Sequence, residues 1–269
     1  MTPPPVRQLA LFGSTGRMGQ SIVQALRQAP QWRLRAAVAS KGSVHLGRDA
    51  ALEGEPLGVP VASDVPRALE GATVAMDFSL AGAVAAHADA CAAAHVPLLV
   101  GTTGLDEAAH QALRRAAQHI AVLVAPNTSV GVGVLMDLAV SAVRSLGPDF
   151  DVEILEAHHR AKRDAPSGTA LALGEAIATA RGHSLAALAE PYGARSAAAR
   201  VPGSIGFAVL RAGDIVGDHT VIFASAGERL EITHRATDRL TFARGALRAA
   251  EWLSVRPAGL YRMENVLRP

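Results

Sequence analysis

The sequence contains very little cysteine. Its 269 residues include a single one, Cys91, which excludes an internal disulfide and a cysteine-based zinc site. Cys91 lies in an alanine-rich stretch, residues 81–95, where a buried and inert thiol is expected. One thiol is also typical of proteins in a reducing compartment, so the composition favours a cytoplasmic location.

Lysine is nearly absent as well. Of the 26 basic residues only Lys41 and Lys162 are lysines, and the others are arginines. Because arginine stands almost everywhere a cation is needed, these two lysines are candidates for sites that require a compact ammonium group or a tunable pKa. For each of them, chance survival on the surface is the alternative.

The chain also lacks long apolar runs and clusters of positive charge. No uninterrupted apolar run reaches about 18 residues, which argues against a membrane span. The net charge is +2 and no basic run is present, so a nucleic-acid partner is not expected. Residues 1–7 are proline-rich and no apolar core follows them, which argues against a secretory signal.

The first part of the sequence alternates apolar strand-like runs with helical patterns. Such alternation predicts an α/β domain with a Rossmann-type, doubly wound parallel sheet covered on both faces, which binds ligands at the carboxyl ends of its strands. The predicted strands are residues 8–12, 34–39, 74–78, 98–100 and 120–124, and the predicted helices are residues 16–28, 80–95 and 106–119.

The pattern changes after residue 129. Strand-length runs cluster between residues 204 and 236, which predicts a second, α+β domain with a mixed or antiparallel sheet. We therefore expect a dinucleotide-binding domain over 1–129, to which 238–269 returns, and a second domain over 130–237. In the second domain and beyond it, the predicted helices are 130–146, 168–180 and 241–253, and the predicted strands are 151–156, 206–210, 220–224 and 230–234.

A glycine-rich turn follows the first predicted strand and opens a helix. Glycines let the backbone approach a pyrophosphate, and the helix N-terminus supplies amide donors. The spacing is G-x-x-G-x-x-G, a variant of the dinucleotide fingerprint. A purely structural turn is the alternative, but the position in the first βα unit favours a nucleotide site formed by Gly13, Ser14, Thr15, Gly16, Arg17 and Met18.

The end of the second predicted strand carries no acid. NAD-preferring proteins usually place a carboxylate there to bind the adenine ribose. In this chain the region contains Ser40 and Lys41 instead, which together with Arg17 are able to bind a 2′-phosphate. We therefore predict that NADPH is preferred over NADH.

Polar turns also close three further strands. Their positions are those expected beside the nicotinamide half of a cofactor, although ordinary turn chemistry explains any one of them. The turns are Asp77, Phe78 and Ser79; Gly101, Thr102, Thr103 and Gly104; and Ala125, Pro126, Asn127, Thr128 and Ser129.

Residues 156–169 form the densest polar stretch. Adjacent His158 and His159 point in different directions, so one can act as an acid while the other binds an anion. Lys162 supplies a point charge for a carboxylate, or a proton. The run of Ser167, Gly168 and Thr169 opens a helix whose amides and hydroxyls form an anion cradle.

Two other interpretations of this stretch remain open. The histidines with Asp164 are potential metal ligands, but no third convergent ligand is evident, so no metal is predicted. A structural role, in which the histidines cap or line a domain junction, is the other alternative.

These motifs, in this order, resemble the 4-hydroxy-tetrahydrodipicolinate reductase family, also called dihydrodipicolinate reductases. The likeness covers almost the whole chain and includes all the turns above. It continues through Val130, Gly131 and Val132, and its most specific part is E-A-H-H-R-x-K-x-D-A-P-S-G-T at residues 156–169. Its last parts are Ile205, Gly206 and Phe207, followed by Arg211, Ala212 and Gly213.

The resemblance implies NAD(P)H-dependent reduction of 4-hydroxy-tetrahydrodipicolinate, a small dicarboxylate, in diaminopimelate and lysine biosynthesis. It also implies a homotetramer assembled through the second domain. By position, His158 is the acid/base residue, Lys162 a proton donor, and His159, Gly168 and Thr169 hold the substrate carboxylates. Residues 13–18, 101–103 and 125–128 contact the cofactor.

The chain departs from the family pattern at two positions. Ala39 and Ser40 stand where members that use both cofactors often have an acid followed by arginine, and Thr128 stands where phenylalanine is common. Two functional alternatives are another two-domain amino-acid dehydrogenase, such as an aspartate-type enzyme, and a non-catalytic NADP sensor. Neither requires a Ser-Gly-Thr cradle beside His158 and Lys162.

Overall fold

The computed structural model describes residues 6–190 and 200–267. The chain divides into a first unit, Met1–Val130 with Arg239–Pro269, and a second unit, Gly131–Asp238. The sequence-based prediction about a secretory signal falls largely on residues 1–5, which lie outside the described residues.

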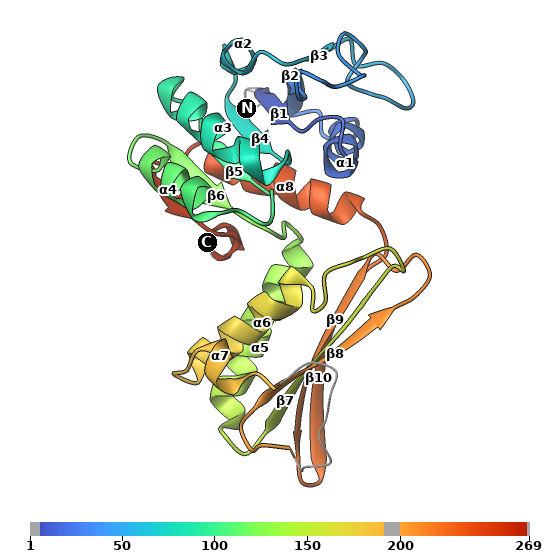
Figure 1. The fold of residues 1–269 in the computed structure, drawn as a ribbon, viewed down its shortest axis with the longest axis vertical. Helices are drawn as coiled ribbons and strands as arrows, with labels where there is room; N and C mark the ends of the chain where they lie inside the picture. Colours follow the sequence, from blue (N-terminus) through green and yellow to red (C-terminus); the bar gives the residue numbers. More distant parts are fainter. Residues whose placement is uncertain (1–5, 191–199, 268–269) are drawn as a thin grey trace, which may run out of the picture. The chain divides into compact units, whose positions relative to one another are not determined.

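The centre of the first unit is a parallel sheet with seven described strands (Figure 1). These are β1 (Arg7–Phe12), β2 (Trp32–Val38), β3 (Val61–Ala62), β4 (Val74–Asp77), β5 (Leu98–Val100), β6 (Ala121–Val124) and β11 (Gly259–Tyr261). The helices are α1 (Arg17–Leu26), α2 (Val65–Leu69), α3 (Ala81–Ala93), α4 (Glu107–Ala116), α8 (Leu240–Leu253) and α9 (Met263–Leu267).

The strand order places a ligand site at one point of this sheet. The order is β11-β6-β5-β4-β1-β2-β3, so the chain moves outward from β1 to β3 and then returns to the other side at β4. A reversal of this kind leaves a crevice at the carboxyl ends of the two strands beside it. The ends of β1 and β4 are therefore where a cofactor is expected.

Successive strand residues bury their side chains on opposite faces of the sheet. On one face, Leu9 and Leu11 of β1 pack in a core with α1 and α8. On the other face, Ala10 and Phe12 pack in a core with α2, α3 and α4. Both faces are apolar, which explains why the strands read as continuous hydrophobic runs.

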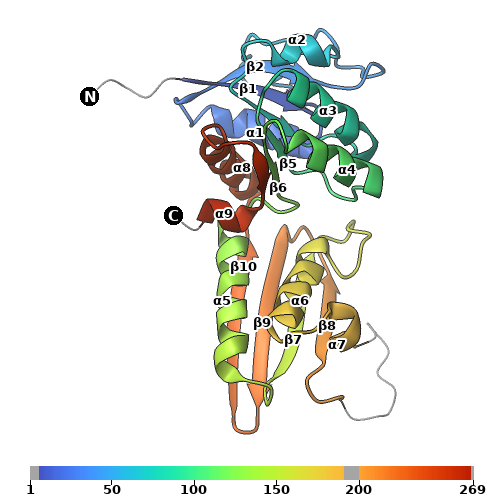
Figure 2. The same cartoon turned by 90° about the vertical axis from the view of Figure 1, so that its left-hand side faces the viewer.

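The second unit contains a sheet with four described strands, in the order β10-β9-β7-β8. β7 pairs parallel with β8 and antiparallel with β9, so the sheet is mixed. Helices α5 and α6 lie on one face of it (Figure 2). The elements are α5 (Val130–Leu146), β7 (Asp151–His158), α6 (Gly168–Ala180), α7 (Leu185–Leu188), β8 (Ile205–Arg211), β9 (Gly217–Ser225) and β10 (Glu228–Ala236).

The predicted fold class is confirmed in both units, and the bounds of β5, α5 and α6 coincide with the predicted ones. Cys91 is fully buried in α3, and burial together with the charge of Asp77 raises the pKa of its thiol. Sequence analysis missed β3, α2, α7, β11 and α9, which have five residues or fewer and too few turns or pleats to show a period. No helix in the described part of the chain is long and apolar enough to cross a membrane.

Candidate active site

The glycine-rich turn lies directly against the neighbouring strand end. Gly13 has φ +74°, and a Cβ atom at this position would lie 2.3 Å from the carbonyl oxygen of Phe78. Any larger residue would therefore separate the turn from the end of β4. Gly16 is the N-cap of α1 and makes no side-chain capping bond, so the first amides of the helix face outward. This arrangement suits a phosphate.

A cavity of about 400 Å³ opens beside this turn. We call it the nucleotide cavity. Of the predicted cofactor residues, Gly13, Thr15, Gly16, Ser40 and Lys41 line it. No carboxylate is among its described lining residues, so nothing there repels a phosphate. Phe78 and Ser79, from the first of the three polar turns, line the cavity as well.

Ser14, Arg17 and Met18 are not among the lining residues of this cavity. The remaining predicted cofactor residues follow β5 and β6, which are paired at Val100 and Val124. Their turns therefore leave the same edge of the sheet. Two of the hydroxyls there make internal bonds. Thr102 Oγ1 lies 3.2 Å from Asp77 Oδ1, and Thr128 Oγ1 donates to the Phe242 carbonyl at 2.7 Å. Thr128 thus bonds the backbone of the first turn of α8, which gives it a structural contact of its own.

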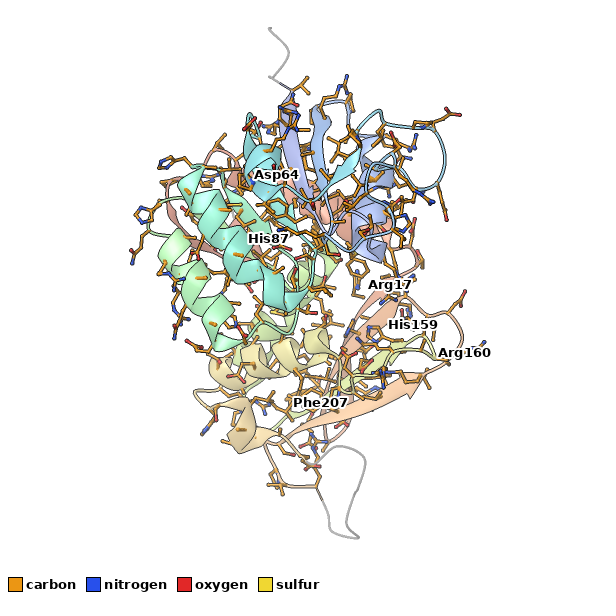
Figure 3. All side chains as sticks on the ribbon, turned by 45° about the horizontal axis from the view of Figure 1, so that its top comes forward. Arg17, Asp64, His87, His159, Arg160 and Phe207 are labelled. Atoms are coloured by element: carbon orange, nitrogen blue, oxygen red, sulfur yellow. The ribbon has the colours of Figure 1, made fainter. Side chains whose placement is uncertain are left out.

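A buried acid–imidazole pair lies behind the nucleotide cavity. Asp77 is completely buried, and its Oδ2 is 2.8 Å from Nδ1 of His87. Figure 3 shows His87 on α3. Burial alone would raise the pKa of Asp77, but bonds from His87 and Ser79 hold it below its ordinary value. His87 also lines the cavity, and its ring centroid lies 4.5 Å from that of Phe12 with the two rings tilted by 37°. Sequence analysis missed His87, because one histidine in an alanine-rich helix carries no pattern.

The predicted chemical segment surrounds a second buried acid, in the second unit. Glu156 on β7 is fully buried. Its Oε2 lies 2.6 Å from Nδ1 of His158, and Arg211 on β8 pairs with both carboxylate oxygens at 2.7 and 2.8 Å. The Ser167 amide donates to Oε1 at 3.0 Å. We call residues 156–169 with Arg211 the β7–α6 site.

The electrostatics of the β7–α6 site keep Glu156 ionised. Burial opposes its charge, but bonds from Arg211 and His158 hold the pKa of the carboxyl below its usual value. Burial lowers the pKa of His158, and Glu156 offsets only part of that effect. His158 therefore holds its second proton weakly, as an acid that must release a proton does.

The two adjacent histidines have different surroundings, as predicted. His158 is buried, whereas His159 is partly exposed in the loop that follows β7 (Figure 3). Lys162, in the same loop, pairs with Asp164 at 2.8 Å. The carboxylate of Asp164, considered above as a potential metal ligand, is therefore paired with the ammonium group of Lys162. Among the described residues no group of three or more metal-ligating side chains comes together.

Ser167 is the N-cap of α6 and is buried beside another histidine. Its hydroxyl accepts from the Ala170 amide at 3.2 Å and lies 3.1 Å from Nε2 of His219 on β9. The backbone amide of Ser167 also donates to Glu156, so both the amide and the hydroxyl of Ser167 are bonded within the protein. The exposed Gly168 then begins the helix. A direct contact between Ser167 and a substrate stays a prediction.

His219 and the side-chain role of Arg211 were missed in the sequence. His219 lies between Asp218 and Thr220, just before the predicted strand 220–224, and its ring lies 5.2 Å from that of His158. Burial and the neighbouring His158 lower the pKa of His219 to about 4. Arg211 had a signal only through the family resemblance, because sequence spacing does not reveal which strand pairs with β7.

Comparison with known protein families gives matches to both halves of the chain. The model described as "Dihydrodipicolinate reductase, N-terminus" matches residues 7–128, and that described as "Dihydrodipicolinate reductase, C-terminus" matches residues 131–267. Together these models cover nearly all of the sequence.

Similar proteins agree with these matches. A protein of Nitrosospira multiformis named 4-hydroxy-tetrahydrodipicolinate reductase is 46% identical and covers 96% of this chain and 97% of its own. One of the same name from Thiobacillus denitrificans is 48% identical, covering 97% and 98%. The solved structure of a dipicolinate-bound dihydrodipicolinate reductase from Paenisporosarcina sp. TG-14 aligns with TM-score 0.78 and 25% identity, over 97% of this chain and 100% of that one.

The lowered pKa of His219 predicts a loss of stability in acid. Its pKa falls from 6.5 to about 4 on folding, so the unfolded chain binds more protons between these values. The stability that the neutral form of His219 contributes to the free energy of unfolding is fully present above pH 6.5. It decreases by roughly 3 kcal/mol as the pH falls to about 4. We expect the His219→Gln variant to lose this part of the pH dependence in urea unfolding, while His119→Gln, at an exposed position, retains it. Parallel pH curves for wild type and His219→Gln would contradict the assignment.

Proposed function

The chain belongs to the dihydrodipicolinate reductase family, and on that basis we propose that it reduces 4-hydroxy-tetrahydrodipicolinate to tetrahydrodipicolinate with NAD(P)H. The step belongs to diaminopimelate and lysine biosynthesis. We assign cofactor binding to the first unit, and substrate binding and oligomerisation to the second.

One observation carries this proposal beyond the sequence match. In the β7–α6 site the buried carboxylate of Glu156 bonds both His158 and Ser167, the first residue of the cradle. An acid and an anion-binding helix start are therefore held by one group. A dicarboxylate substrate that must receive a proton on a ring carbon needs both features.

The reaction adds a hydride and a proton to the substrate and releases one water. Loss of the ring hydroxyl as water gives a conjugated imine, and the hydride adds at the far carbon. His158, with Lys162 nearby in the chain, supplies the proton to the adjacent ring carbon. His159, Gly168 and Thr169 bind the carboxylates, whose negative charge the amides and cations of the site stabilise.

The residues of the first unit fit a dinucleotide. The close approach at Gly13, the uncapped start of α1 and the nucleotide cavity supply a turn, amide donors and space. When bound, the cofactor supplies the hydride. Ser40 and Lys41, both exposed at the cavity, are assigned to a 2′-phosphate, with Arg17 as a further cation. The turns after β5 and β6 are assigned to the nicotinamide half.

Replacing His158 tests the proposed chemistry. We expect His158→Gln to lower kcat by about 10² to 10⁴-fold with little change in KM, because a positioned acid contributes about this much. Lys162→Ala is expected to lower kcat and raise KM. The assay follows the loss of NADPH absorbance with the condensation product of pyruvate and aspartate semialdehyde.

His183→Gln, an exposed histidine in the same unit, is the control for this experiment. Its kinetics should match the wild type. Absence of turnover by the wild type would refute the proposed function, and near-normal kcat in His158→Gln would refute the role of that residue.

The cofactor preference is tested at Lys41. We expect the wild type to have a higher kcat/KM with NADPH than with NADH. Lys41→Ala should raise KM for NADPH by about 10-fold, the loss of one hydrogen bond to a charged group, and leave KM for NADH unchanged. Arg48→Ala, which removes an exposed cation that does not line the cavity, is the control. Equal or better efficiency with NADH in the wild type would overturn the preference.

We propose that the enzyme is a homotetramer. The face of the second sheet opposite α5 and α6 includes Leu155 and Leu210, which are 41% and 49% exposed in the single chain. Light scattering should give four times the mass of one chain, and Leu155→Glu with Leu210→Glu should lower it. Leu260→Glu, an exposed leucine of the first unit, should leave the mass unchanged. A monomeric wild type at micromolar concentration would disprove the assembly.

A further inference from the structure

We propose that Glu156 is a positioning residue for this reaction, which holds His158 in one tautomer and orientation and ties it to the start of the carboxylate cradle. The inference rests on the proposed function for its chemistry. Its geometry concerns only residues of the second unit. No part of it requires Glu156 to touch the substrate.

The hydrogen bonds around Glu156 account for both of its oxygens. Oε2 accepts from His158 Nδ1 and from Arg211, and Oε1 accepts from Arg211 and from the Ser167 amide. The carboxylate is fully buried, so water does not compete for it. A buried carboxylate with every contact supplied by a donor is stable only as the anion.

An anion at this place determines the proton position on His158. Because ionised Glu156 only accepts hydrogen bonds, Nδ1 of His158 carries a proton in both charge states of the ring. Nε2 is then the nitrogen that gains and loses the second proton. It lies over a part of β9 without a side chain, since a Cβ atom at Gly217 would be 3.1 Å from it. The ring is thus held at Nδ1 by Glu156, and its Nε2 side faces the backbone of Gly217.

The charged and titratable groups that face His158 come from several elements. Glu156 is on β7, Arg211 on β8, His219 on β9 and Lys162 in the loop after β7. Arg211 and Lys162 disfavour the imidazolium form, whereas Glu156 favours it. Loss of the Glu156 charge would leave the cation of Arg211 uncompensated beside the ring. The acid form of His158 therefore depends on this carboxylate.

Glu156 also connects the acid to the cradle. The Ser167 amide is eleven residues away in sequence, and its 3.0 Å bond to Oε1 fixes the start of α6 relative to β7. A glutamine at 156 can still accept from this amide through its carbonyl oxygen. The variant Glu156→Gln therefore removes the charge beside His158 while it preserves the support of the cradle, and kcat should change far more than KM.

Kinetics of two matched variants test the proposal. Glu153 is on the same strand, and its partner is Arg200, which does not belong to the β7–α6 site; the two side chains pair at 2.6 Å. We expect Glu156→Gln to lower kcat by at least about 10²-fold with KM changed by less than about threefold. The alkaline limb of the pH profile, where His158 loses its proton, should shift to lower pH. Glu153→Gln should retain wild-type kinetics. Equal effects of the two variants, or a loss only in KM, would overturn the proposal.

An NMR titration of the imidazole nitrogens of His158 in the full chain without substrate provides a second test. In the wild type, Nδ1 should remain protonated throughout and Nε2 should titrate. In Glu156→Gln the titration should move to lower pH. A wild-type ring with an unprotonated Nδ1 would refute the inference, even if the variant fails to fold. If the titrations behave as expected but the wild type does not turn over the substrate, the positioning role stands and the proposed function fails.

Discussion

The second unit depends on the cost of burying one carboxylate. An unpaired buried charge is strongly unfavourable, so Glu156 is tolerated only with Arg211, His158 and the Ser167 amide in place. These partners come from β7, β8 and the start of α6. Satisfying one charge therefore determines the relative positions of three elements, and it holds His158 beside the start of α6.

The first unit uses the same physical device at the switch point of its sheet. Asp77 is buried at the end of β4 and accepts bonds from Ser79, His87 and Thr102. These donors belong to the turn after β4, to α3 and to the turn after β5. In each unit, a buried acid at a strand end organises the loops that form the candidate site, so the loops inherit the rigidity of the sheet.

Periodicity and turn residues were enough to predict the doubly wound sheet and the long helices, because these signals are local. The density of polar residues from Glu156 to Thr169 also indicated a candidate site, and the structure brings several of them together around Glu156. Partners that are distant in sequence carried no such signal. Arg211 reaches Glu156 only because β8 pairs parallel with β7, and His219 reaches Ser167 only through the register of β9. Strand pairing between distant segments is a tertiary property, which spacing along the chain does not encode.

The return of residues 239–267 to the first unit has a consequence for the order of synthesis. Helix α8 supplies Ala243, Ala246 and Leu253 to one core of that unit, and β11 extends its sheet beside β6. A ribosome makes these segments after the whole second unit. The nascent first unit therefore exposes part of an apolar sheet face while the second unit emerges and folds, and the nucleotide-binding half reaches its final form only after residues 239–267 have been made.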